Sequence, residues 1–113
     1  MEPITLNEEN LAEKIFGAAK PALLFFHSDR CIFCRRTELA FEELADETDS
    51  IVFAKIDADA NPGLTSRFGI MGLPAFILID GGKEISRSVG MKTKAQLITM
   101  ILSKADGKLQ FSR

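Results

Sequence analysis

Two cysteines, separated by two residues, are the side chains most able to do chemistry in this chain. Cys31 and Cys34 are its only cysteines, and they follow 22-ALLFFH-27, an apolar run typical of a strand buried on both faces. Helix formers begin at Ile32, so the pair should lie at a helix N-terminus. Unpaired N–H groups and the helix dipole favour thiolate at Cys31. Cys34, one turn later, could then attack a mixed disulfide formed at Cys31.

The neighbours of the cysteines leave several interpretations open. Arg30, Arg35 and Arg36 would favour thiolate if they turned toward the sulfur, but they could equally be solvated charges at a helix start. Tetrahedral zinc needs four ligands, whereas the chain offers two cysteines and one histidine, His27. Inert buried thiols are the other alternative, although C-x-x-C in a strand-helix-strand pattern favours redox chemistry. We therefore expect no metal and no cofactor, and we expect His27 to be a packed or half-exposed residue at a strand end rather than a catalytic base.

Apolar periodicity predicts alternating helices and strands around the cysteines. Helices are predicted over residues 7–19, from 32 to about 48, from 61 through 68, and from 93 onward, and strands over 22–27, 51–57, 74–80 and 84–89. Strands separated by helices should pair in parallel, and a final hairpin at 81-GG-82 should add antiparallel edges. The predicted fold is α/β, a mixed parallel/antiparallel central sheet with helices on both faces.

Capping residues and apolar stripes support the helices. Thr5 with Glu8, and Thr93 with Gln96, have capping-box spacing, and Asn61 precedes a proline suited to the first helical position. The methionines and phenylalanines are expected to be core residues for the most part. The predicted buried stripes are Phe33, Ala40, Phe41, Leu44 and Ala45 in the second helix and Leu97, Ile98, Ile101 and Leu102 in the last.

Length and charge limit the remaining function classes. The 113 residues suit a single domain, residues 1–113, of which 106–113 could be a flexible tail. The net charge of −2 argues against nucleic-acid binding, and the longest apolar run, 73-LPAFILI-79, cannot span a membrane. The N-terminus does not resemble a signal peptide. We expect a cytoplasmic monomer, or a periplasmic one if a signal segment has been removed.

Three further motifs accompany the cysteine pair, and with it they resemble the thioredoxin family over nearly the whole chain. They are 43-ELADE-47, 55-KIDADANPGLTSRFGIMGLPAF-76 and 89-VG-90. The resemblance implies the thioredoxin fold and a protein-disulfide oxidoreductase acting on disulfide-containing proteins, supplied with electrons by a reductase or a dithiol donor.

Roles for individual residues follow from the same resemblance. Cys31 is expected to be the nucleophile and Cys34 the resolving thiol. Pro74 is expected to form a cis peptide bond that faces the cysteines, and Leu73 to offer backbone hydrogen bonds to a bound substrate chain. Lys55 matches the family's lysine in the strand beside the site.

The chain departs from the family pattern on the surface that meets redox partners. Arg30 stands where the family has tryptophan, Ile32 and Phe33 replace the Gly-Pro between the cysteines, and Leu39 replaces a proline. Arg30, Ile32 and Phe33 are therefore candidate substrate contacts of altered character. Two alternative functions follow: a dedicated reductase or oxidase for one partner in a thiol-disulfide interchange system, or a binding module with little turnover.

A further departure affects proton transfer. The family's buried aspartate, which helps to move the proton of the second cysteine, is replaced by Phe25. With Phe25 at that position, no nearby group in the strand can take the proton from Cys34, so resolution should depend on water, on a base from the partner, or on Lys55 as a neutral amine.

Overall fold

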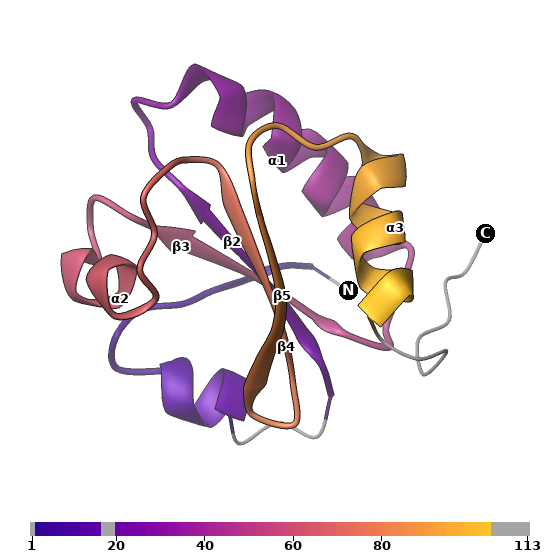
Figure 1. The fold of residues 1–113 in the computed structure, drawn as a ribbon, viewed down its shortest axis with the longest axis horizontal. Helices are drawn as coiled ribbons and strands as arrows, with labels where there is room; N and C mark the ends of the chain where they lie inside the picture. Colours follow the sequence, from indigo (N-terminus) through magenta and orange to yellow (C-terminus); the bar gives the residue numbers. More distant parts are fainter. Residues whose placement is uncertain (1, 17–19, 105–113) are drawn as a thin grey trace.

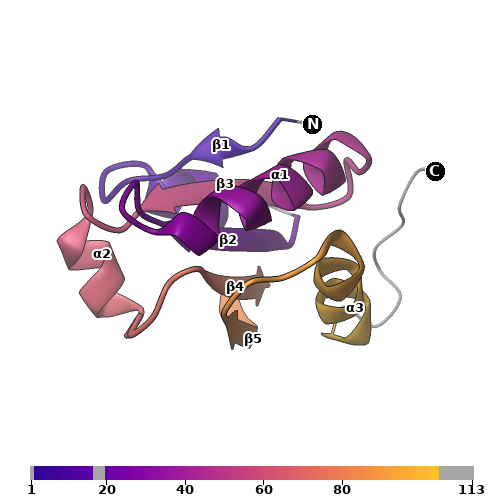
Figure 2. The same cartoon turned by 90° about the horizontal axis from the view of Figure 1, so that it is seen from above.

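A computed structural model describes residues 2–16 and 20–104 of the chain. The strand before the cysteines, β2 (Ala22–His27), lies at the centre of its sheet (Figure 1). It pairs in parallel with β3 (Val52–Asp57) and antiparallel with β4 (Ala75–Asp80). β1 (Ile4–Thr5) extends the sheet in parallel beyond β3, and β5 (Lys83–Val89) extends it antiparallel beyond β4. Figure 2 shows the resulting order β1-β3-β2-β4-β5, which confirms the predicted mixed sheet.

Helices cover both faces of this sheet. Figure 1 shows α1 (Ile32–Asp46) and α3 (Lys94–Lys104) on one side of the strands, and η1 (Ala12–Phe16), a short π-helix, and α2 (Pro62–Arg67) on the other. Side chains of β2 alternate between the two layers: Leu23 and Phe25 belong to the core cluster under α1 and α3, and Leu24 and Phe26 to the opposite one. Burial on both faces explains why this strand is apolar throughout.

Two of the predicted local signals form as expected. Gly81 and Gly82 join β4 to β5 with φ of 62° and 77°, values that a tight hairpin turn requires and that glycine adopts without strain. At the start of α3, the Thr93 N–H donates to Gln96 Oε1 (2.9 Å) and the Gln96 N–H donates to Thr93 Oγ1 (3.1 Å). The second predicted capping box is therefore confirmed.

The N-terminal prediction is wrong in its details. Thr5 lies in β1 instead of capping a helix with Glu8. The reciprocal bonds form between Asn7 and Asn10, whose backbone N–H groups donate to each other's side-chain Oδ1 at 2.8 and 3.0 Å. Helical structure follows only in η1, and the end of the predicted helix, 17–19, lies outside the described residues, as does the predicted tail. Pairing with β3 holds Thr5 in extended conformation, so the cap moves two residues along the chain.

Both predicted helical stripes contain one misplaced residue. The buried face of α1 begins at Cys34, and Phe33, one residue earlier and so about 100° around the helix, is exposed. In α3, Leu97 and Ile101 are buried whereas Leu102, again one residue out of phase, is exposed. Asn61 does occupy the N-cap of α2, but its side-chain amide donates to the Asp57 carbonyl (3.0 Å) instead of capping the helix.

Candidate active site

The end of β2 and the start of α1 together position the cysteine pair. Cys31 is the N-cap residue of α1, with φ −93° and ψ 105°, and its Sγ accepts a hydrogen bond from the Cys34 N–H at 3.2 Å. The Cys31 N–H donates to the Ser28 carbonyl (3.0 Å), which ties the loop to the strand. The sulfur of Cys31 therefore lies at the positive end of the helix, where a thiolate is stabilised.

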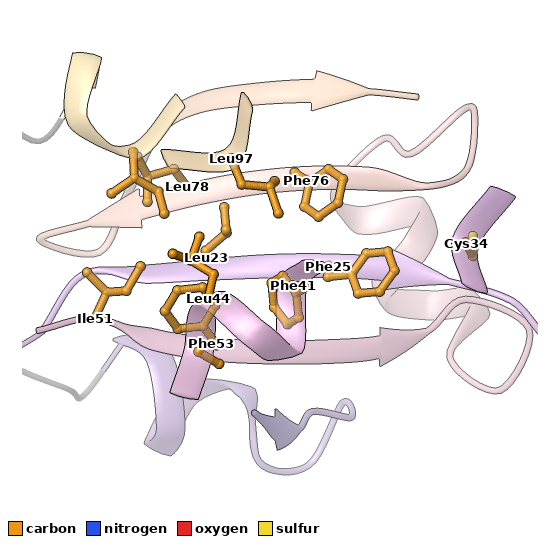
Figure 3. Close-up of a cluster of buried hydrophobic side chains, with 12 residues drawn as sticks. Leu23, Phe25, Cys34, Phe41, Leu44, Ile51, Phe53, Phe76, Leu78 and Leu97 are labelled. Carbon is orange, nitrogen blue, oxygen red and sulfur yellow. The ribbon is translucent and has the colours of Figure 1, made fainter. Parts of the chain in front are cut away.

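The two thiols differ in their surroundings. Cys31 is partly exposed, whereas Cys34 is 3% exposed and belongs to the apolar cluster under α1 (Figure 3). Burial, followed by the hydrogen bond with Cys31, raises the pKa of the Cys34 thiol to about 12. Cys34 is consequently a neutral thiol at physiological pH.

The arginines beside the cysteines do not act as a group. Arg30 forms an ion pair with Asp59, with 3.0 Å between its Nη2 and the carboxylate Oδ1. Hydrogen bonding to Asp59 raises the pKa of Arg30, and the same bond lowers the pKa of Asp59. Arg35 and Arg36 are exposed at the start of α1. The exposure of Arg35 and Arg36 agrees with charges at a helix start that meet solvent, whereas Arg30 is turned toward Asp59.

Lys55 is bound by two carboxylates that sequence reasoning missed. Its Nζ lies 2.9 Å from Glu38 Oε2 and 2.9 Å from Glu42 Oε2. Burial would lower the pKa of Lys55, but the hydrogen bonds to Glu42 and Glu38 raise it overall. The ammonium form is therefore held, and the hypothesis of a neutral Lys55 acting as base is wrong. The i, i+4 spacing of the two glutamates was the available signal, but only the packing of α1 on β3 brings them to Lys55.

The proline loop lies against the same core as the cysteines. The Leu73–Pro74 peptide bond is cis, as the resemblance implied. The Pro74 carbonyl accepts a hydrogen bond from the Gly90 N–H at 2.8 Å, which anchors the loop to the end of β5. Leu73 and Cys31 both pack, partly buried, against the apolar cluster that contains Cys34. The fold thus brings together segments that lie some forty residues apart in the printed sequence.

The comparison with protein families agrees with this geometry: the thioredoxin family model matches residues 2–103. The chain belongs to the thioredoxin family. Its fold is the thioredoxin fold, and with the Cys31–Cys34 pair it is a thiol-disulfide oxidoreductase. Neither the dedicated-partner enzyme nor the binding module is favoured by these matches.

Curated relatives support the assignment. The chain is 38% identical over 95 residues to a thioredoxin of Alicyclobacillus acidocaldarius, a match covering 83% of this chain and 90% of the relative. It is 34% identical over 96 residues to a thioredoxin of Chlamydia muridarum, covering 85% and 92% respectively. A bifunctional thioredoxin reductase/thioredoxin of Mycobacterium leprae is 31% identical over 96 residues, covering 84% of this chain but 21% of that protein.

Phe25, where the family pattern has an aspartate, is a core residue of this thioredoxin-family chain. Its side chain is fully buried, its ring stacks on Phe76 at a centroid distance of 5.0 Å, and it packs against Phe41 at 5.1 Å. Figure 3 shows it at the end of the cluster toward Cys34. No carboxylate is therefore presented to Cys34 from β2.

Large apolar side chains are exposed between the thioredoxin-type cysteines and in the loop before Pro74. Ile32 is 77% exposed and Phe33 58% exposed, while Met71, in the loop before Pro74, is 98% exposed. The expectation that methionines belong to the core is wrong for Met71 and for Met91, which is 44% exposed. Among the described residues no helix has the length and apolar character needed to cross a bilayer, and no three His, Cys, Asp or Glu side chains cluster as a metal site would require.

A pocket of about 440 Å³ opens beside Cys34. It lies between the end of β2 and the first two turns of α1. Three of the residues that line it carry groups able to accept a proton: His27, Asp29 and Glu38.

Proposed function

We propose that this chain reduces disulfide bonds in proteins, with Cys31 as the attacking thiolate and Cys34 as the resolving thiol. The difference in burial between the two sulfurs is the observation that supports these roles. Cys31 can meet a substrate and lies at the helix N-terminus, where its thiolate is stabilised. Cys34 is buried, neutral and within one helical turn of it.

The exchange proceeds in two steps. Cys31 thiolate attacks one sulfur of the substrate disulfide, and the other substrate sulfur leaves as a thiolate. Cys34 then loses its proton and attacks Cys31 Sγ, which releases the second substrate sulfur. The substrate gains two electrons and, with its protons, becomes a dithiol, while Cys31 and Cys34 become a disulfide.

Substrate docking is assigned to the surface around the cysteines. Leu73 and Pro74 are proposed to align an extended substrate segment, and Ile32 and Phe33 to pack against its side chains. The exposure of both apolar residues supports this role, because large exposed apolar groups beside a reactive centre are typical of contact surfaces. Arg30, held by Asp59, would add a positive charge at the margin.

Turnover needs a source of electrons for the Cys31–Cys34 disulfide. We propose a reductase or a dithiol donor, because one relative carries the name thioredoxin reductase/thioredoxin. A single chain supplies every residue named above, so we propose that the protein acts as a monomer.

The direct test combines turnover with trapping. The wild-type protein should accelerate insulin reduction by dithiothreitol, and Cys31→Ser should abolish the acceleration. Cys34→Ser should retain the first step and accumulate insulin linked to Cys31, visible by mass spectrometry without reductant. Alkylation of the reduced wild type with limiting iodoacetamide should label Cys31 first. Labelling of Cys34 first would reverse the assignment, and equal trapping by both serine variants would contradict the distinction between the two thiols.

A further inference from the structure

Resolution requires a proton acceptor, and the position in β2 where the family pattern has an aspartate is occupied by Phe25. Cys34 must lose its proton as it attacks Cys31, and its pKa of about 12 keeps free thiolate scarce at neutral pH. The proton therefore has to leave during the attack, to a group close to the sulfur. Phe25 cannot take it, because it is a buried hydrocarbon side chain. Lys55 cannot either, because its ammonium form is held by Glu38 and Glu42.

Glu38 is placed where such an acceptor is needed. It follows Cys34 by four residues on α1, so the two side chains lie one above the other on the same face of the helix. Both line the pocket beside Cys34. The side chain of Glu38 is about one-third exposed, so a proton that it receives can pass to solvent.

Lys55 fixes the position of this carboxylate. The ammonium of Lys55, on β3, bonds Glu38 Oε2 at 2.9 Å and Glu42 Oε2 at the same distance. Lys55 engages Oε2 of Glu38, which leaves Oε1 of the same carboxylate outside that ion pair, and the Glu38 side chain lines the pocket of Cys34. Glu42 lies a further turn along α1 and does not line the pocket of Cys34.

We propose that Glu38 accepts the proton of Cys34 while this thiol attacks the mixed disulfide at Cys31. The bond between Cys34 and Cys31 forms, the bond between Cys31 and the substrate breaks, and the released substrate sulfur carries away the electron pair. The proton passes to Glu38, directly or through one solvent molecule, and then to bulk water. The inference rests on the proposed function in one respect, that Cys34 is the resolving thiol.

The charges around Cys34 predict a different result if Glu38 acts only through its negative charge. His27 and Asp29 border the pocket from the end of β2 and the following loop, Arg35 and Glu38 border it from α1, and Lys55 reaches Glu38 from β3. The negative charge of Glu38 contributes to raising the pKa of Cys34. If Glu38 acted only through this charge, removing it would ease deprotonation of Cys34 and speed resolution. A proton acceptor predicts slower resolution.

The test isolates the resolving step with dithiodipyridine as the substrate disulfide. Reduced full-length protein in excess releases one thiopyridone when Cys31 attacks and a second when Cys34 resolves the mixed disulfide, and both are seen by stopped-flow absorbance. The first phase depends on protein concentration and the second does not. Rates are recorded from about pH 6 to about pH 9 for the wild type, Glu38→Gln, Glu38→Asp, Glu42→Gln and His27→Asn.

We expect Glu38→Gln to slow the second phase about tenfold or more at neutral pH, leaving a rate that rises roughly tenfold per pH unit as hydroxide takes over. The first phase should be little changed. Glu38→Asp should restore part of the rate. Glu42→Gln is the matched control, because it removes an ion pair of the same length to the same lysine, and it should leave the second phase within about threefold of the wild type.

An unchanged or faster second phase in Glu38→Gln overturns the proposal. Equal slowing by Glu42→Gln would also overturn it, since the effect would then belong to Lys55 and its ion pairs. Slowing by His27→Asn alone would assign the proton to His27. Failure of the proposed function gives a different result in the same assay applied to Cys31→Ser and Cys34→Ser. The first phase would then be lost in Cys34→Ser instead of Cys31→Ser.

Discussion

The ionisation of Cys34 makes the stability of the fold depend on pH in a way that one substitution can isolate. We compare Cys31→Ser, in which Cys34 is the sole thiol of the chain, with the double variant Cys31→Ser/Cys34→Ala, which has none. Neither protein can form the internal disulfide. Every other titrating group is common to both, so the difference between them reports Cys34 alone.

The size of the effect follows from the raised pKa. An unfolded chain ionises its thiol near the model value of 9.0, whereas the folded protein holds the proton of Cys34 up to about 12. The folded state therefore binds more protons between these values, and the stability that Cys34 contributes, complete below about pH 9, is lost as the pH rises toward 12. At about pH 10.5 the full shift corresponds to about 2 kcal/mol. Contributions from Cys31 are absent in the serine background, so we expect about 1 to 2 kcal/mol.

Urea unfolding at about pH 7.5 and about pH 10.5, followed by circular dichroism with a phosphine reductant, measures the effect. The stability advantage of Cys31→Ser over the double variant should shrink by about 1 to 2 kcal/mol between the two conditions. If the stability advantage changes by less than about 0.3 kcal/mol between the two pH values, Cys34 ionises as readily in the folded protein as in the unfolded chain. The assignment of Cys34 as a buried neutral thiol would then be refuted.

Substitutions at three other positions test the packing, a helix cap and a turn by urea unfolding. Phe25→Asp should lower the free energy of unfolding by about 4 kcal/mol or more, because it removes a stacked ring and buries a polar group. Phe25→Leu should lower it by only about 1 kcal/mol. Equal losses would show that the loss of the ring, and not the buried polar group, causes the destabilisation. Thr93→Ala should cost about 1 kcal/mol through loss of the reciprocal cap of α3, and no loss would mean that the cap is not used in solution. Gly81→Ala should cost about 1 kcal/mol from its positive φ alone, since no atom lies near the added methyl, and a stabilised variant would contradict the turn geometry.

Local signals predicted the elements that depend on short-range interactions. The apolar run 22-ALLFFH-27 is β2 at the predicted bounds, because burial on both faces requires an uninterrupted apolar strand. The 81-GG-82 hairpin and the Thr93 cap formed as expected, since each is determined by residues within a few positions. The placement of Cys31 at a helix start follows in the same way from the change of periodicity after β2.

Long-range pairing accounts for the features that the pattern did not indicate. β1 has only two residues, too few for a periodic signal, and it exists because its backbone bonds to β3 about fifty residues later in the printed sequence. That pairing displaced the first cap from Thr5 to Asn7. The exposure of Phe33 likewise depended on which face of α1 meets the sheet, and a shift of one residue rotates a side chain by about 100°.

Some features of the site depend on adjacent residues, and others depend on long-range packing. The sequence by itself determined that two thiols one turn apart begin a helix, that no carboxylate precedes them in β2, and that the chain resembles thioredoxins, because each depends on adjacent residues or on motif spacing. Only the tertiary structure decided that Cys34 is buried, that Lys55 is held as a cation, and that Glu38 shares a pocket with Cys34. Burial and ion pairing arise where α1 packs across β2 and β3, and residue spacing within one helix carries no information about the strand that the helix will cover.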